Sequence, residues 1–199
     1  VYTPNVPVWT TVMPQAAIDG ARYRPTGVTY LAAGEVNQVD KYRAILASGR
    51  GSNLDAILKA IQEGSLAARI VAVVSDQPEA QALEKAQKAG IPALCIRPDP
   101  ALPLEKRRQD HEERILSELA PLQPRFLVMA GYMRVVTPRL IEAFRSERGY
   151  SRIVNVHPSL LPAFPGVESY RQAFEHGTQL SGVTVHLVEL QVDDGPICA

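Results

Sequence analysis

From Tyr42 onward, short apolar runs alternate with longer segments in which apolar residues recur every three or four positions. Short apolar runs are typical of strands buried on both faces of a parallel sheet, whereas the longer spacing is typical of helices that bury one face. The pattern predicts strands at residues 42–47, 70–74, 94–96, 126–129, 152–156 and 182–189. It predicts helices that begin near residue 54 and after residue 137, and that cover residues 80–89, 104–119 and 168–175. This alternation predicts an α/β fold with a doubly wound, mostly parallel sheet built from right-handed βαβ units.

Residues 1–40 do not follow this alternation. Their β-prone runs at 8–12 and 27–32 lie among scattered Gly, Pro, Asn and Asp residues, a mixture that fits either edge strands with loops or an ordered arm. We therefore predict an N-terminal arm of unknown role at residues 1–40 and a single α/β domain at residues 41–199.

Composition narrows the class of protein. The apolar fraction of 46% and the charged fraction of 21% are ordinary for a globular chain. The 21 basic and 21 acidic residues balance, which argues against a broad nucleic-acid surface and leaves a local anion pocket open. Cys95 and Cys198 show no disulfide framework and no metal-ligand spacing, and the apolar run around Cys95 predicts a core position. No apolar run approaches a membrane span, so we expect a cytoplasmic protein without a membrane or nucleic-acid partner.

Asn155 and His157 are the first candidates for chemistry. Pro158 cannot donate to a sheet ladder and ends the strand, which leaves His157 at the carboxyl end, where open α/β sheets place their ligands. Asn155 lies two positions earlier, so its side chain points to the same side. An amide and an imidazole side by side can polarise a carbonyl and move a proton. A buried Asn and a strand-capping His with purely structural hydrogen bonds explain the same residues.

The loop at residues 48–53 joins the first strand to a helix N-terminus. Such a loop presents backbone N–H groups that suit a phosphate, with Gly49 and Gly51 allowing close approach and Ser52 and Asn53 adding donors. It matches neither the Walker A motif nor the dinucleotide-binding glycine motif. The alternative is a glycine-rich turn in which Asn53 caps the helix.

Three further segments have both a functional and a structural interpretation. Residues 130–136 follow a strand, and their apolar side chains could wall a slot for a flat heterocycle or simply pack the loop. His186 lies inside a strand, where a structural hydrogen bond is the common explanation. The segment Asp193-Asp194-Gly195 is a turn signal that could also supply a catalytic carboxylate.

The charged residues of 104–119 predict a mostly solvated helix face. His111 on that helix, and His176 beside the glycine that ends a later one, are predicted at the surface.

Together these segments are more specific than any one alone, because five of them occur in a fixed order. The chain from about Tyr42 to Ala199 resembles the phosphoribosylglycinamide formyltransferases, the folate-dependent transformylases of purine synthesis. The resemblance rests on Ser48-Gly49-Arg50-Gly51-Ser52-Asn53-Leu54, Ala130-Gly131-Tyr132-Met133-Arg134, Asn155-Val156-His157-Pro158-Ser159-Leu160-Leu161-Pro162, Pro165-Gly166, and Gly182-Val183-Thr184-Val185-His186 with Asp193-Asp194-Gly195-Pro196. It implies a Rossmann-like formyltransferase domain at residues 41–199.

The resemblance also implies roles for individual residues. The catalytic trio would be Asn155, His157 and Asp193, with Asp194 the alternative carboxylate and His186 in support. The phosphate of 5-phosphoribosylglycinamide would bind Gly51, Ser52 and Asn53. The donor 10-formyltetrahydrofolate would bind a set made of Arg108, Met133, Arg134, Val135, Val136 and Asn155. Arg108 is placed by counting back from Ala130-Gly131, and Lys106 and Arg107 are its neighbours. No metal is implied, and a homodimer is left open.

The chemistry of these residue types agrees with formyl transfer. As an amine attacks the formyl carbon, an Asn amide and a protonated His can donate to the developing oxyanion. A carboxylate can hold a water that carries the proton to the leaving nitrogen.

The sequence departs from the family's pattern at both ends. The family has no counterpart of residues 1–40, and it continues for several dozen residues beyond Asp-Gly-Pro, so the domain is expected to lack the usual C-terminal part. One hypothesis is that the arm replaces some of that part.

The rival functions are those of a formyltetrahydrofolate deformylase, a methionyl-tRNA formyltransferase and a catalytically silent binding module. A Pro after His157 and the Gly-Ser-Asn loop argue against the first, and the absence of an added RNA-binding domain argues against the second.

Overall fold

The computed structural model describes residues 42–198, so the predicted arm at residues 1–40 and its two β-prone runs lie outside the described residues. The strands are β1 (Tyr42–Leu46), β2 (Arg69–Ser75), β3 (Ala93–Cys95), β4 (Phe126–Met129), β5 (Ile153–His157) and β6 (Thr184–Leu187). The helices are α2 (Ser52–Gln62), α3 (Gln81–Lys88), α4 (Leu104–Leu119), α5 (Pro138–Ala143) and α6 (Ser169–Glu175), with a 3₁₀ turn, η2, at Ala120–Leu122. The predicted strand–helix alternation is confirmed.

These strands form one sheet in the order β3-β2-β1-β4-β5-β6. The first five are parallel, and β6 runs antiparallel to β5. The doubly wound, mostly parallel sheet is therefore as predicted, with one antiparallel strand. Beyond β6, the peptide groups of residues 196–198 pair with its outer edge, since Leu187 N donates to Pro196 O and Cys198 N donates to Val185 O.

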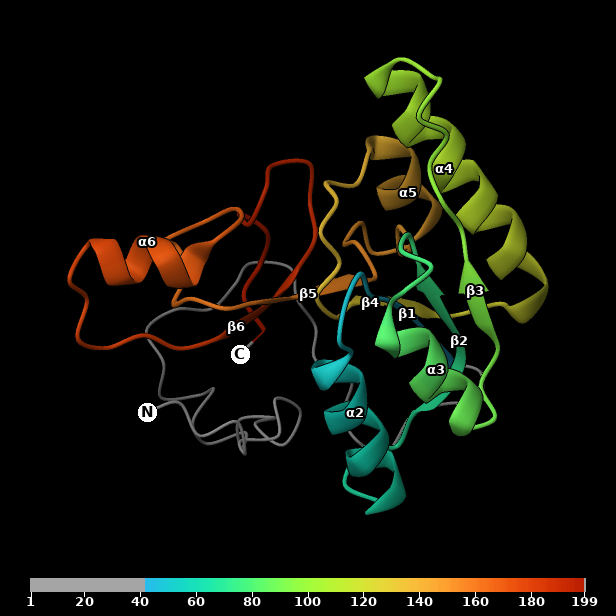
Figure 1. The fold of residues 1–199 in the computed structure, drawn as a ribbon, viewed down its shortest axis with the longest axis horizontal. Helices are drawn as coiled ribbons and strands as arrows, with labels where there is room; N and C mark the ends of the chain where they lie inside the picture. Colours follow the sequence, from blue (N-terminus) through green and yellow to red (C-terminus); the bar gives the residue numbers. More distant parts are fainter. Residues whose placement is uncertain (1–41, 199) are drawn as a thin grey trace.

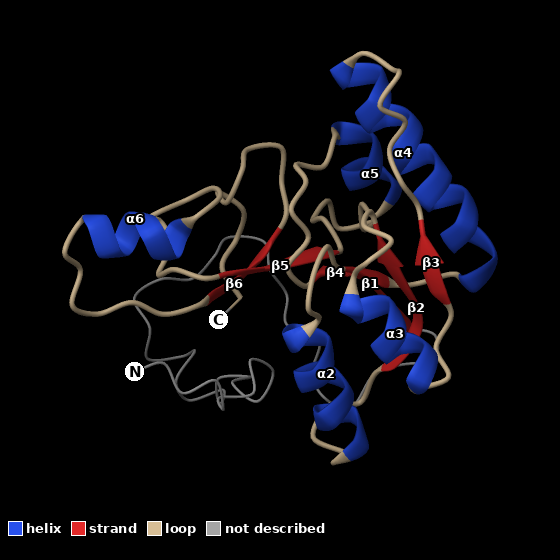
Figure 2. Cartoon of the chain, viewed as in Figure 1, coloured by secondary structure: helices blue, strands red, loops and turns tan. Residues whose placement is uncertain are grey.

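Helices cover both faces of the sheet (Figures 1 and 2). Alternate residues of β1 point to opposite faces of the sheet. Ala44 and Leu46 pack with α4 and α5 on one face, and Ile45 packs with α2 and α3 on the other. The alternation follows from the strand period of two. Figure 1 places α6 at the other end of the long axis from α4. No helix of residues 42–198 is long and apolar enough to cross a membrane.

The order of the strands reverses between β1 and β4. Chains leaving these neighbouring strands turn in different directions, which opens a crevice at the carboxyl edge of an α/β sheet. The loop after β1 and the loop after β4 are the two segments predicted to bind phosphate and folate. They lie side by side, because Ser48 N donates to Gly131 O at 3.0 Å.

Most element boundaries agree with the pattern, and α4 and β4 match it residue for residue. Thr137 caps α5 as predicted: its side chain accepts a hydrogen bond from Arg139 N, and Pro138 occupies the first helical position. Helix α2 differs, because it begins at Ser52 and its N-cap is Gly51 rather than Asn53.

Two predictions about single residues are wrong. His111 is buried rather than at the surface, because α4 places it on the same helix face as Ile115 and Leu119, which pack on the sheet. Cys95 is exposed rather than in the core, because β3 is the outermost strand of the sheet and is only three residues long. His176 is exposed, as predicted.

Candidate active site

The structure brings Asn155, His157 and Asp193 together at the carboxyl end of β5. Asn155 and His157 are on β5, and Asp193 lies in the turn that follows β6. One carboxylate oxygen of Asp193 is 3.4 Å from Asn155 Nδ2, and the other is 3.3 Å from His157 Nδ1. Asp194 is exposed. Of the two neighbouring carboxylates, Asp193 is therefore the one that faces the pair.

Both ring nitrogens of His157 face oxygen acceptors. Nε2 is 2.9 Å from the carbonyl oxygen of Phe164, and Nδ1 faces Asp193. The side chain is buried, with a relative exposure of 4% for the residue. A neutral imidazole has one donor, so the doubly protonated ring is the state that can donate to both oxygens. The ring is thus arranged as a donor, and a substrate oxygen would have to compete with Phe164.

Local backbone geometry holds these partners in place. Phe164 and Asp193 both adopt positive φ angles, of 55°, which is uncommon for residues other than glycine. Gly166 N donates to the Asp193 carboxylate at 2.7 Å, so the Pro165-Gly166 segment fixes the carboxylate as well. Strained backbone of this kind is concentrated at functional sites.

His186 fixes the amide of Asn155. It is 1% exposed on β6, and its Nδ1 is 2.9 Å from the carbonyl oxygen of Leu187, so Nδ1 carries a hydrogen. Burial lowers the pKa of His186 and outweighs the hydrogen bond to Leu187 and the charge of Asp193, which act in the opposite direction. Nε2 of the neutral ring can then accept from Asn155 Nδ2, which lies 3.1 Å away, while Asp193 Oδ1 lies 3.4 Å from the same nitrogen. The amide nitrogen, rather than the amide oxygen, therefore points toward His186.

The predicted phosphate loop leads into α2. Gly51 is its N-cap with φ of 70°, no side chain caps the helix, and Ser52 and Asn53 form the first turn. A Cβ on Gly51 would lie 3.0 Å from the Cα and Cβ of Ala82, because α3 packs closely against the loop. The N–H groups of this first turn have no partners within the helix, which is the geometry that binds anions elsewhere.

The predicted folate loop faces a cavity of about 180 Å³ between residues 132–135 and α4. Arg108, Met133, Arg134 and Val135 all line it. Val136 does not, and instead packs against the core cluster that holds Leu140. This differs from the prediction that residues 133–136 act together, because the chain turns inward to begin α5.

The cavity also distinguishes between the three basic residues at the start of α4. Arg107 lines its edge, but its guanidinium is bonded to the carbonyl oxygens of Pro100 and Leu102 at 2.8 Å. Lys106 does not line the cavity. Arg108 lines the cavity and has no such bond to a carbonyl oxygen of residues 42–198, and its contact with an anionic group stays a prediction.

Sequence reasoning missed two buried carboxylates near this cavity. Glu112 lines it and accepts hydrogen bonds from Thr137 N and Thr137 Oγ1. Burial raises the pKa of Glu112, and the hydrogen bonds from Thr137 counteract this only in part. Asp76 lies directly after β2 and bonds to Arg134. A polar residue at the carboxyl end of a central strand was the available signal for Asp76.

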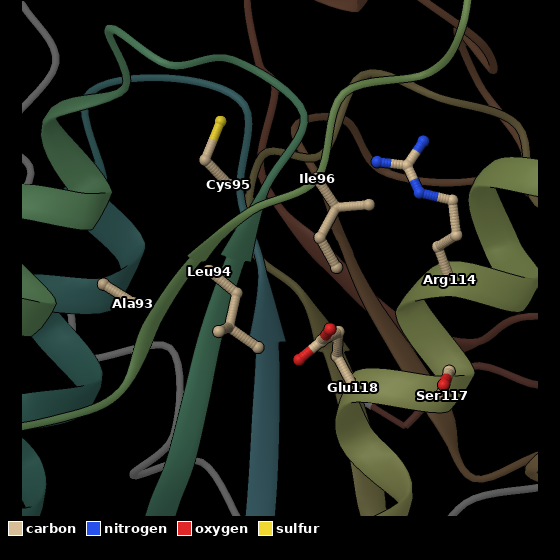
Figure 3. Close-up of a pocket in the computed structure, with 7 residues that line it drawn as sticks. All are labelled: Ala93, Leu94, Cys95, Ile96, Arg114, Ser117 and Glu118. Carbon is tan, nitrogen blue, oxygen red and sulfur yellow. The ribbon is translucent and has the colours of Figure 1, made fainter.

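A larger cavity, of about 340 Å³, lies between β3 and α4 (Figure 3). It is lined by Ala93, Leu94, Cys95, Ile96, Arg114, Ser117 and Glu118. None of the predicted site residues contributes to it, so its size does not make it the active site. Within residues 42–198, no group of three His, Cys, Asp or Glu side chains is arranged to hold a metal ion.

Fold and site together define a class of protein. An α/β sheet carries an Asn, a His and a carboxylate near the end of β5, and the loops after β1 and β4 lead to a helix N-terminus and to a cavity lined by Arg108. The family described as formyl transferase matches residues 41–199. The chain therefore belongs to the formyl transferase family.

The relatives give a more particular description. The phosphoribosylglycinamide formyltransferase of Bacillus subtilis is 36% identical over 156 residues, which cover 78% of this chain and 75% of that protein. The crystal structure of glycinamide ribonucleotide transformylase 1 from Symbiobacterium toebii matches with a TM-score of 0.72 and 40% identity, covering 86% of this chain and 75% of that one. A formyltetrahydrofolate deformylase from Pseudomonas putida matches with a TM-score of 0.67 and 28% identity, covering 81% and 54%. The transformylases are thus more similar in sequence and in length.

Proposed function

We propose that this protein transfers a formyl group from 10-formyltetrahydrofolate to the amine of 5-phosphoribosylglycinamide, a step of purine synthesis. The observation that carries the proposal is the cluster of Asn155, His157 and Asp193, whose contacts are 3.3–3.4 Å long. The relatives' names support the ribonucleotide as the acceptor, and the resemblance to the folate-dependent transformylases implies the donor.

The catalytic steps follow from the donors in this cluster. The bound folate would supply an activated formyl carbon. As the amine of the ribonucleotide attacks that carbon, negative charge develops on the formyl oxygen. His157 Nε2 can donate to this oxygen if the oxygen takes the place of Phe164 O. Asn155 Nδ2 can donate its second hydrogen, which now meets Asp193 at the longer distance of 3.4 Å.

Asp193 can accept the proton that the attacking amine loses and deliver it to the leaving nitrogen. The new carbon–nitrogen bond forms while the bond from carbon to the folate nitrogen breaks, so one proton must move from the amine to the leaving nitrogen. A carboxylate held by Gly166 N and His157 is a suitable acceptor, directly or through one water. His186 keeps the Asn155 amide in its donating orientation throughout.

The substrates fit the two loops at the strand reversal. We assign the ribonucleotide phosphate to Gly51, Ser52 and Asn53 at the start of α2, where helix N–H groups and the helix dipole favour an anion. We assign the folate to the cavity beside Met133, Arg134 and Val135, with Arg108 available for a carboxylate. The lining combines apolar side chains, such as Met133 and Val135, with charged ones, so it offers contacts both to a flat heterocycle and to an anionic group.

One assay tests the function. The protein is incubated with 10-formyltetrahydrofolate, with and without 5-phosphoribosylglycinamide, and the release of tetrahydrofolate is followed. We expect release that depends on the ribonucleotide. Release without it would identify a deformylase, and no release under either condition would identify a silent binding module.

A further inference from the structure

Asp76 is a buried carboxylate at the edge of the candidate site, and the catalytic steps above do not use it. It follows β2 directly and is 4% exposed. Three side-chain donors converge on it: Ser48 Oγ at 2.6 Å, Arg134 Nε at 2.8 Å and Gln77 Nε2 at 2.9 Å. Burial by itself would raise the pKa of Asp76, but these hydrogen bonds outweigh burial and the pKa is lowered. The carboxylate is therefore charged at neutral pH.

Ser48 links Asp76 to the loop after β4 through hydrogen bonds of its hydroxyl group. Its hydroxyl has one hydrogen, which it gives to Asp76, so its lone pairs are free to accept. The backbone N–H of Met133 donates to this hydroxyl at 3.1 Å, and Ser48 N donates to Gly131 O. Two hydrogen bonds with Ser48 thus fix the turn between Gly131 and Met133.

Arg134 fixes the same loop from its other end. Its Nε pairs with the second oxygen of Asp76, so the carboxylate holds the loop directly at Arg134 and, through Ser48 Oγ, at Met133 N. Met133 needs this support, because it is 70% exposed and little side-chain packing holds it. Met133 and Arg134 both line the cavity that we assign to the folate.

We propose that Asp76 and Ser48 are positioning residues, which hold residues 131–134 in the shape that binds the folate. This proposal rests on the proposed function. Ser48 also begins the loop assigned to the phosphate, so a single residue sets the spacing between the two substrate loops. If the loop samples other shapes, the apparent affinity falls in proportion to the binding-competent fraction.

Steady-state kinetics of Ser48→Ala and Asp76→Ala test the proposal. A hydrogen bond of ordinary strength corresponds to roughly a three- to tenfold change in an equilibrium constant. We expect the KM for 10-formyltetrahydrofolate to rise by at least that factor in both variants, while kcat and the KM for the ribonucleotide change by less than about twofold. The matched control is Gln77→Ala, which removes the third donor to Asp76 without touching either loop and should leave all three constants unchanged.

Amide hydrogen exchange provides a readout that does not depend on turnover. The amide of Met133 should exchange faster in Ser48→Ala and Asp76→Ala than in the wild type or Gln77→Ala. An unchanged folate KM with unchanged exchange would overturn the proposal. So would equal losses in kcat and both KM values, which indicate general loosening. If the wild type shows no formyl transfer, the proposed function fails, and the exchange rates still decide whether Asp76 holds the loop.

Discussion

At the scale of single residues, the hydrogen bonds of the histidines determine what each can do. His157 faces two oxygen acceptors and is arranged to donate, whereas His186 accepts from Asn155. These roles could not be read from the sequence, because they depend on Phe164 O and Leu187 O, backbone atoms whose positions follow from the fold. The sequence did predict that the side chains of Asn155 and His157 lie on one side of a strand, because they are two positions apart.

The buried histidines predict a dependence of stability on pH. Burial lowers the pKa of His111 and of His186 below the ordinary value of about 6.5, although each ring has a hydrogen bond to a backbone carbonyl that opposes the shift. Below about pH 6.5 the unfolded chain therefore binds protons more readily than the folded chain. The free energy of unfolding should fall as the pH is lowered through this value, by about 1.4 kcal/mol for each unit of pKa shift.

Urea unfolding at pH 8, 7, 6 and 5.5 measures this loss, and His111→Gln separates one histidine from the other. Glutamine does not titrate, but it retains an N–H group that can reach the carbonyl of Ile96, as His111 Nε2 does at 2.7 Å. We expect the acid loss to be smaller in the variant. If the wild type and His111→Gln lose stability in parallel, His111 does not contribute.

At the scale of elements, the sequence predicts those features that depend on local physical chemistry. Helix α4 and the Thr137-Pro138 start of α5 were predicted because a helical period and a capping residue are local signals. The burial of Glu112 was missed, because it depends on how α5 docks beside α4: Glu112 accepts from the backbone and hydroxyl of Thr137. Likewise, the sequence did not indicate the N-cap at Gly51, which has a φ of 70° and lies where α3 packs against the loop.

The two glycines of the loop before α2 give a matched pair of variants. Gly51 has φ of 70° and would place a Cβ 3.0 Å from Ala82, whereas a Cβ on Gly49 would meet no atom within 4 Å. Gly51→Ala should therefore lower the free energy of unfolding by about 1–2 kcal/mol and raise the KM for the ribonucleotide. Gly49→Ala should change both much less. Equal effects in the two variants, measured by urea unfolding and steady-state kinetics, would show that the left-handed cap is not needed.

At the scale of the whole molecule, the site lies where the strand order reverses. The loops after β1 and β4 meet there, and β5 brings Asn155 and His157 to the same edge of the sheet. The sequence predicted that each of these two loops follows a strand, and their roles in binding stay predictions. It did not predict how they are joined, because Asp76 and Ser48 connect segments that are 28 residues apart, and Ser48 connects to Met133 across 85.

The most direct test of this account is the kcat for formyl transfer in Asn155→Ala and His157→Ala relative to the wild type. Both side chains are assigned to donate to the formyl oxygen, so each loss should lower kcat on the order of a hundredfold or more. The KM for the ribonucleotide should change little, because its phosphate is assigned to the loop before α2. Turnover near the wild-type value in both variants, with the fold intact by circular dichroism, would contradict the account.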